Sequence, residues 1–180
     1  KIYANGTASN PIVYQEIKHT PGEWGGLVIL GKATSNRSAT GESTSELGEK
    51  IFGGKENSDN SGSLTYVIIK DSGAKFNTEK EFNGLSLFGV GSGTKIDNIY
   101  VENGGDDGIE FFGGTVNASN IIVNGVGDDS FDWTEGWSGT GTNWYAKRRS
   151  SAINNEPGNR GIEADTQDTN PDANPVSNPT

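Results

Sequence analysis

Short runs of β-branched, aliphatic and aromatic residues recur along the chain, and glycine, asparagine or aspartate bounds each run. Such bounded runs are typical of β-strands. The predicted strands are Ile12–Tyr14, Leu27–Leu30, Leu64–Ile69, Leu85–Phe88, Ile96–Val101, Ile109–Phe112 and Ile121–Val123. No stretch of ten or more residues places apolar side chains at i, i+3, i+4 and i+7, as an amphipathic helix would. The pattern therefore predicts an all-β chain with almost no helix.

The strand pattern repeats with a period of about 22 residues, roughly the length of one β-solenoid turn. The segments Ile96–Gly114 and Ala118–Gly136 align without a gap at an offset of 22 residues. Copies with insertions are Leu64–Gly73 with Asn83–Val90, Gly141–Ser150 with Gly161–Asp165, and Pro11–Tyr14 with Gly25–Leu30. Short strands without helices at this period predict a right-handed parallel β-helix, whose turns pair at a spacing of about 4.8 Å.

Alignment of the copies places apolar residues in columns that would face the inside of the solenoid, because alternate strand residues point to opposite faces. Two columns are Val67, Ile99, Ile121, Trp144 and Ile69, Val101, Val123, Ala146. Two more are Leu27, Leu85, Ile109, Phe131, Ile162 and Ile29, Leu87, Phe111, Trp133, Ala164. These columns predict one continuous core along the solenoid axis.

A column of asparagines accompanies the apolar ones. Asn98, Asn120 and Asn143 occupy one repeat position. Stacked amides can hydrogen-bond along the axis, and asparagine tolerates the left-handed backbone of a tight corner. We therefore expect an asparagine ladder at this position.

We expect one β-helix domain over residues 1–180, because this length suits a single domain. Polar insertions interrupt the repeat at about 31–62, 74–82 and 149–160, where they either cover a sheet face or carry a binding function. The chain opens without methionine directly into a strand-like sequence. We therefore expect a piece of a longer chain, whose remainder would be its neighbour.

The charge of the chain narrows the set of partners. The formal net charge is −10 and the pI is about 4.5. Proteins that bind nucleic acid carry a basic stripe, and anionic membrane surfaces attract basic segments, so neither partner is expected. No apolar stretch reaches the roughly 18 residues that membrane insertion requires. The acidic surface favours cations as ligands.

Four segments carry a resemblance to a known group of proteins. They read KIYANGTASNPIVY, GEWGGLVILGKA, DNSGSLTYVIIKDSG and GDDGIEFFGGTVNASN. They resemble the secreted bacterial right-handed parallel β-helix repeat proteins, surface or exported proteins of outer-membrane-bearing bacteria whose activity is mostly undefined. The resemblance implies an extracellular or outer-membrane-surface location. Because a complete acid/base set is absent from the sequence, we expect a non-catalytic module that serves as a structural rod, in adhesion or in glycan binding.

Repeated carboxylates are the main candidates for chemistry. A Gly-Asp-Asp sequence occurs in two successive turns, and a second column follows three positions later. These residues are Asp106, Asp107, Asp128 and Asp129, and then Glu110, Asp132 and Glu163. Carboxylates one turn apart repel by roughly a few kcal/mol at an effective dielectric constant near 20. They can be solvated, be protonated, accept corner N–H bonds or share a cation.

Calcium suits a site in which carboxylates share a cation, because it takes six to eight oxygen ligands. The candidate ligands are Asp106 with Asp128, and Glu110 with Asp132. Calcium is the one cofactor that the residues indicate.

A polysaccharide-active enzyme is the alternative. β-Helix pectin hydrolases use an aspartate pair and a third aspartate, which would make Asp106, Asp107, Asp128 and Asp129 catalytic. The other motifs of those hydrolases are missing, since the single histidine, His19, lies outside the repeated turns. A calcium-dependent lyase would need a base, and Lys147, Arg148, Arg149 and Arg160 are the candidates. Arginine is a poor base because its pKa exceeds about 12, so these cations are expected to pair with acids.

Outward aromatic residues are candidate carbohydrate contacts. Tyr100 and Tyr145 share an outward column with two isoleucines, Phe88 and Phe112 share another, and Trp137 lies at a turn where exposure is expected. Tyr100, Tyr145 and Trp137 are therefore predicted to meet sugar rings. The competing interpretation is that outward aromatics pack beneath the insertions.

Overall fold

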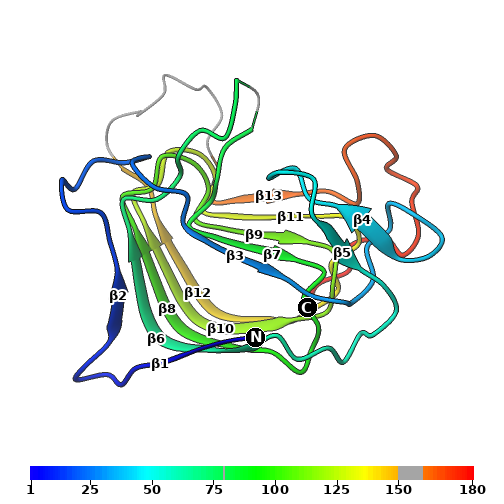
Figure 1. Ribbon diagram of the computed structural model, residues 1–180, viewed down its shortest axis with the longest axis horizontal. Helices are drawn as coiled ribbons and strands as arrows, with labels where there is room; N and C mark the ends of the chain where they lie inside the picture. The colour runs from blue at the N-terminus through cyan, green and yellow to red at the C-terminus, as the bar shows by residue number, and fades with distance from the viewer. Residues whose placement is uncertain (79, 150–159) are drawn as a thin grey trace.

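The computed structural model describes residues 1–78, 80–149 and 160–180 and contains thirteen strands and no helix in those ranges (Figure 1). Consequently, none of the described residues belongs to a helix long and apolar enough to cross a membrane. Two parallel sheets face each other across the core. The long-strand sheet contains β1 (Ile2–Asn5), β2 (Ile12–Tyr14), β6 (Gly62–Lys70), β8 (Lys95–Glu102), β10 (Asn117–Asn124) and β12 (Gly141–Lys147).

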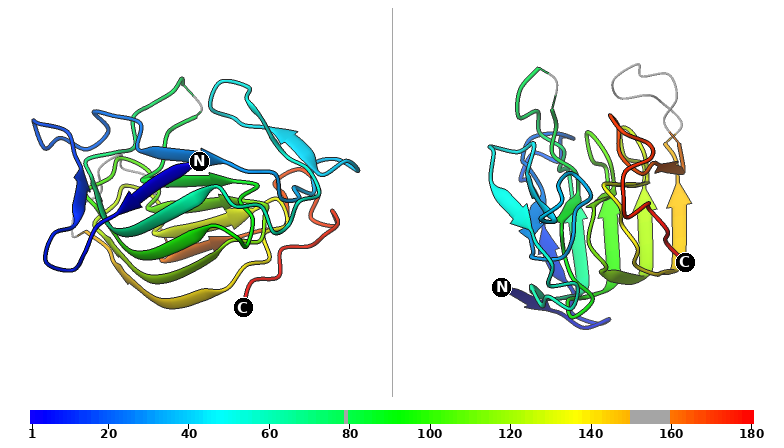
Figure 2. Two further views of the ribbon diagram at one scale, coloured as in Figure 1. Left: turned by 60° about the horizontal axis from the view of Figure 1, so that its bottom comes forward. Right: turned by 90° about the vertical axis from the view of Figure 1, so that its right-hand side faces the viewer.

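The short-strand sheet follows the order β13 (Ile162–Ala164), β11 (Phe131–Thr134), β9 (Ile109–Phe112), β7 (Leu85–Phe88) and β3 (Leu27–Leu30). The first turn supplies β1 and β2 to the long-strand sheet, and each later turn supplies one strand to each sheet. Successive turns stack along one axis (Figure 2). The fold is a parallel β-helix, as the repeat predicts.

The strand register confirms the four predicted apolar columns. Val67 lies opposite Ile99, Ile99 opposite Ile121, and Ile121 opposite Trp144. The short-strand sheet continues in the same way from Leu27 to Ile162. The central members are fully buried. The members in β12 and β13 are partly or well exposed, because no further turn of the described chain stacks on these strands.

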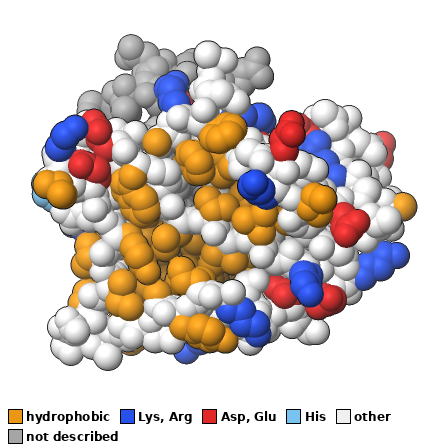
Figure 3. All heavy atoms as spheres, viewed as in Figure 1, with side chains coloured by type: hydrophobic (Ala, Val, Ile, Leu, Met, Phe, Trp, Pro, Cys, Tyr) orange, Lys and Arg blue, Asp and Glu red, His pale blue; other side chains and the backbone are white. Residues whose placement is uncertain are grey.

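The opposite end of the solenoid faces the reader in Figure 1, and apolar side chains gather on it between the two sheets (Figure 3). The partly buried residues that pack against the core there are Ile2, Ile12, Tyr14, Trp24 and Leu27.

The asparagine position marks the bend of each long strand. Asn98, Asn120 and Asn143 all have φ of 56°, in the left-handed region that asparagine tolerates. The left-handed asparagine interrupts the alternation of side chains along the strand. Ile96 and Ile99, three positions apart, therefore both face the core. Asn143 donates its Nδ2 to Asn120 Oδ1 at 3.1 Å, whereas Asn120 donates to Asp97 Oδ1 at 2.8 Å rather than to Asn98. One of the two expected amide–amide bonds is therefore replaced by an amide–carboxylate bond.

An inserted hairpin covers part of the outer face of the short-strand sheet. Between β3 and β6, the strands β4 (Glu42–Thr44) and β5 (Ile51–Gly53) pair antiparallel. Phe52 of this hairpin packs on Phe88 with a ring-centroid distance of 5.2 Å, and Phe88 stacks on Phe112 at 4.0 Å. Phe88 and Phe112 therefore pack beneath an insertion and offer no sugar platform.

Trp137 is buried, so the prediction that it is an exposed aromatic is wrong. Its exposed fraction is 0%. The turn after β11 directs the indole into the core, where it stacks on Phe111 at 4.1 Å and donates Nε1–H to the carbonyl of Val116 at 3.1 Å. Its backbone carbonyl accepts a bond from Asn178 N at 3.0 Å, so the C-terminal segment lies beside it. A residue in this position cannot contact a carbohydrate.

Candidate cation site in an acidic cluster

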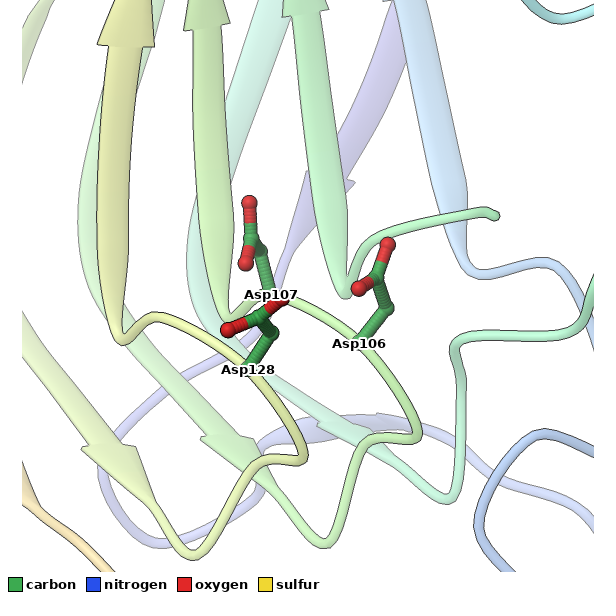
Figure 4. Close-up of side chains that lie close together, drawn as sticks. All are labelled: Asp106, Asp107 and Asp128. Atoms are coloured by element: carbon green, nitrogen blue, oxygen red, sulfur yellow. The ribbon is translucent and has the colours of Figure 1, made fainter. Parts of the chain in front are cut away.

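Three aspartates meet at the corners that lead into β9 and β11. Asp106 and Asp107 precede β9, and Asp128 holds the equivalent place of Asp106 one turn later. Because β9 pairs with β11, the two corners lie side by side. One carboxylate oxygen from each aspartate lies within 4.8 Å of the others, and Figure 4 shows the three side chains gathered between the corners.

A second group of three carboxylates shares Asp107 with the first. Glu110 of β9 lies opposite Asp132 of β11, and oxygens of both lie within 4.8 Å of an Asp107 oxygen. The structure thus brings together both pairs that the sequence nominated as metal ligands. It also places Asp107, which the sequence indicated only for the catalytic alternative, at the centre. We call Asp106, Asp107, Glu110, Asp128 and Asp132 the acidic cluster.

Most of the acidic cluster lies under an insertion and is shielded from solvent. Asp107 and Glu110 are each 9% exposed, although Glu110 points outward from the core as the alternation predicts. Asn83, which directly follows the 74–82 insertion, donates Nδ2–H to Glu110 Oε2 at 2.6 Å. Glu81 of the same insertion hydrogen-bonds to Asp106. The repeat could not reveal this cover, because the insertion lies outside the repeated pattern.

Burial and mutual repulsion raise the pKa values of the cluster. Burial, followed by the charges of Glu81 and Asp128, raises the pKa of Asp106 to about 8. Burial, followed by the charge of Glu163, raises the pKa of Asp132 to about 7. For Asp107 and Glu110, burial and then neighbouring carboxylates raise the pKa well above its usual range. Without a compensating positive charge, the cluster therefore holds protons near neutral pH.

Nearby cations pair with the carboxylates around the cluster. Lys75 contacts Glu81 at 2.6 Å and Lys80 contacts Glu46 at 2.8 Å. Arg160 lies 2.9 Å from Glu163 and 3.7 Å from Asp129. Among the described residues, no lysine or arginine forms an ion pair with Asp107, Glu110 or Asp132. The centre of the cluster is therefore the part that lacks positive charge.

The donor atoms fit a hard divalent cation. The two groups offer only carboxylate oxygens, and calcium prefers oxygen ligands. Asn83 is 2% exposed, and its Oδ1 has no hydrogen-bond partner although its Nδ2 reaches Glu110. Rotation of this amide by about 180° would exchange its donor and acceptor and turn a carbonyl oxygen toward the carboxylates. After this rotation, the buried Asn83 oxygen would be one more oxygen ligand for the cation that the acids favour.

Backbone capping explains part of the arrangement as well. Asp107 Oδ1 accepts the backbone N–H of Asp129 at 2.9 Å, and Asp129 accepts the backbone N–H of Arg160. Asp129 is 2% exposed and interacts with Arg160 rather than completing either group of three. Of the four aspartates of the catalytic alternative, Asp106, Asp107 and Asp128 thus form one group, and Asp129 lies outside it.

The other predicted site residues lie elsewhere. Lys147, Arg148 and Arg149 line a cavity at the ends of β8, β10 and β12, together with His19, which lies 3.3 Å from Asp71. Tyr100 and Tyr145 lie in one outward row with Ile122 between them, as predicted. None of the five residues of the acidic cluster lines this cavity, whereas Arg160 lies beside Glu163 and Asp129.

Comparison with known protein families gives a match over the whole chain. The family described as a pectate-lyase like beta helix domain matches residues 1–180, the whole chain. No curated protein and no solved structure matches the chain.

Proposed function

Because the chain belongs to the family of pectate-lyase-like β-helix domains, we propose that it is a non-catalytic extracellular module whose acidic cluster binds and is stabilised by Ca²⁺. The observation that carries this proposal is the sharing of buried Asp107 by two groups of three carboxylates beside the unpartnered Asn83 oxygen. A cation there would offset the burial and the mutual repulsion of the carboxylates, which together raise four pKa values.

Burial favours an ion over a polymer as the ligand of the cluster. A polysaccharide must contact its catalytic carboxylates directly, whereas Asp107 and Glu110 are 9% exposed beneath the 74–82 insertion. A dehydrated ion needs only a small opening. Calcium suits the irregular oxygen set better than magnesium, which demands near-octahedral geometry and keeps its waters.

An extracellular or outer-membrane-surface location is part of the same proposal. The resemblance to secreted β-helix proteins supports it. For a calcium site in an extracellular module, we expect a dissociation constant of about 10⁻⁴ to 10⁻³ M. The stacked turns then form a rigid rod that can space or display binding surfaces.

A polysaccharide-active enzyme stays the second candidate for one reason. The pKa values of Asp106, about 8, and Asp132, about 7, lie in the range that general acid–base catalysis uses. Incubation with polygalacturonate and alginate tests this alternative. Reducing ends or unsaturated products, lost in Asp106→Asn, would establish catalysis and refute the non-catalytic assignment.

Calorimetric titration with calcium near pH 8 tests the proposed site directly. The wild-type protein is expected to bind calcium and to release protons, because the cluster is partly protonated before the ion enters. Asp107→Asn removes the shared ligand and should weaken binding by at least about tenfold, the cost of roughly 1.4 kcal/mol. Asparagine retains the oxygen that accepts the Asp129 N–H, so the corner should persist.

The matched control is Asp172→Asn, which removes the same charge from an exposed residue far along the chain. It should bind calcium as the wild type does. Equal affinity in the wild type and Asp107→Asn would show that the cluster is not the calcium site.

A further inference from the structure

Residues 31–37, at the start of the 31–62 insertion, run along the solenoid axis across the ends of three strands of the short-strand sheet. Backbone hydrogen bonds link this segment to residues that follow β7, β9 and β11, and they join Ala33 to Gly89 at 2.8 Å, Thr34 to Gly114 at 2.8 Å and Asn36 to Glu135 at 3.0 Å. Turns of a solenoid ordinarily contact only their neighbours. Residues 31–37, which we call the strap, therefore link β7 to β11, although these two strands do not pair with each other.

Glu135 occupies a corner at which the two preceding turns have glycine. The register of β7, β9 and β11 aligns it with Gly89 and Gly113. All three corners have a left-handed backbone, with φ of 57° at Gly89, 65° at Gly113 and 56° at Glu135. Glycine adopts this conformation readily, whereas a residue with a side chain is strained there. A glutamate at this corner therefore needs a compensating interaction.

The carboxylate of Glu135 provides that interaction, because the strap holds it. It is 5% exposed and accepts hydrogen bonds from Ser35 Oγ at 2.6 Å and Arg37 Nε at 2.9 Å. Ser35 is fully buried and Asn36 nearly so. Hydrogen bonds to an ionised group are stronger than those between neutral groups, and a buried environment strengthens them further. Three consecutive residues of the strap thus bind one residue at the end of β11.

The strap also binds residues 165–178, which we call the C-terminal segment. The side-chain amide of Asn36 makes three hydrogen bonds with this segment, to Thr166 O at 2.8 Å, to Pro175 O at 3.0 Å and from Gln167 Nε2 at 3.0 Å. Arg37 forms an ion pair with Asp168 at 2.8 Å. The first two bonds join residues 130 and 139 positions apart, and Figure 1 shows the insertion and the orange-to-red C-terminal segment on the same side of the solenoid. Asn36 and Arg37 therefore connect the C-terminal segment to Glu135.

Strand β13 alone is a weak attachment for the C-terminal segment that follows it. It is three residues long, and all three residues are exposed. Such an end of a solenoid opens locally at low cost, because few buried contacts are lost. The buried hydrogen bonds of the strap supply the contacts that β13 lacks.

We propose that the strap is a conformational coupling device. Through Glu135 it couples the first insertion to the C-terminal segment, so that both segments open in one step and the solenoid does not fray from β13. A repeat array without such a link can open turn by turn from its end. Local opening exposes a backbone to proteolysis, so the coupling protects this end of the module. The inference goes beyond the proposed function and does not rest on calcium, because no residue of the acidic cluster belongs to the strap or to the C-terminal segment.

Hydrogen exchange of the whole chain, measured by mass spectrometry in chelator at increasing urea below the unfolding transition, tests this coupling. In the wild type, peptides from the strap and from the C-terminal segment should show one common urea dependence. Glu135→Gly removes the carboxylate and leaves a residue that adopts the same φ without strain. It should make the C-terminal segment exchange about tenfold faster or more, the effect of losing hydrogen bonds to a charged group, while β8 and β10 keep their protection.

Two further variants separate the role of Glu135 from general effects. Lys32→Gln is the matched control, because it removes an exposed ion pair with Glu56, at 3.5 Å, inside the same insertion. It should leave the exchange unchanged. Glu135→Gln retains an oxygen that accepts a hydrogen bond and should give an intermediate rate, and it decides the question if Glu135→Gly does not fold. The inference is overturned if the two segments of the wild type show different urea dependences, if neither Glu135 variant accelerates exchange of the C-terminal segment, or if Lys32→Gln accelerates it equally.

Discussion

In a buffer that contains chelator, raising the pH from about 5.5 to about 8.5 is expected to lower the free energy of unfolding by roughly 2–5 kcal/mol. The folded state holds protons that the unfolded chain releases, because the pKa of Asp106 is raised to about 8 and that of Asp132 to about 7. Unfolded aspartate and glutamate titrate near pH 4. Stability is therefore lost as the pH rises from about 4 through about 8, where these folded-state groups ionise.

Urea denaturation at the two pH values measures this loss. Asp106→Asn/Asp132→Asn removes two of the raised groups and should flatten the dependence while increasing stability at the higher pH. Asp172→Asn, an exposed control, should retain the full slope. A wild type that is equally stable at both pH values would show that the folded cluster does not hold protons that the unfolded chain releases.

Trp137→Ala is expected to destabilise the fold by about 3–5 kcal/mol, the usual cost of removing a large aromatic side chain from a core. Trp137 is 0% exposed and stacks on Phe111 at 4.1 Å and near Trp144 at 6.0 Å. The variant would leave a cavity between the sheets and an unpaired Val116 carbonyl. Thermal or chemical denaturation measures the effect.

Two variants calibrate that measurement. Trp137→Phe retains much of the ring stacking but loses the indole N–H, so its effect should be intermediate. Tyr3→Ala, at a position 67% exposed, should change stability by less than about 0.5 kcal/mol. If Trp137→Ala were as mild as Tyr3→Ala, the indole would not be part of the core.

The repeat predicts the core because each turn must bury its apolar side chains against the next. Ile99 and Ile121 could be assigned to one column from the 22-residue offset alone, and the register confirms it. The hairpin of β4 and β5 could not be predicted, since its short strands, Glu42–Thr44 and Ile51–Gly53, are polar or interrupted by glycine. The hairpin itself lies outside the repeat, and its Phe52 packs on Phe88 of the repeated strand β7.

In the candidate site, too, the residues on strands were predictable from the repeat and the others were not. The strand spacing implies that Glu110 lies beside Asp132, and the structure agrees. The central place of Asp107 was not predictable, because a corner residue does not follow the alternation of a strand. The cover by Glu81, like the inward turn of Trp137, depends on segments that the repeat does not include.

A pair of thermal melts at about pH 8.5, one in chelator and one in millimolar calcium, tests most directly whether the acidic cluster is a calcium site that stabilises this β-helix. The folded state binds the ion and the unfolded chain does not. Stability should therefore rise by about 2.7 kcal/mol when calcium is a hundredfold above its dissociation constant. For a chain of this length that corresponds to an increase of several degrees in the melting temperature, with a much smaller increase in magnesium. Coincident melting curves in calcium and in chelator would contradict the account.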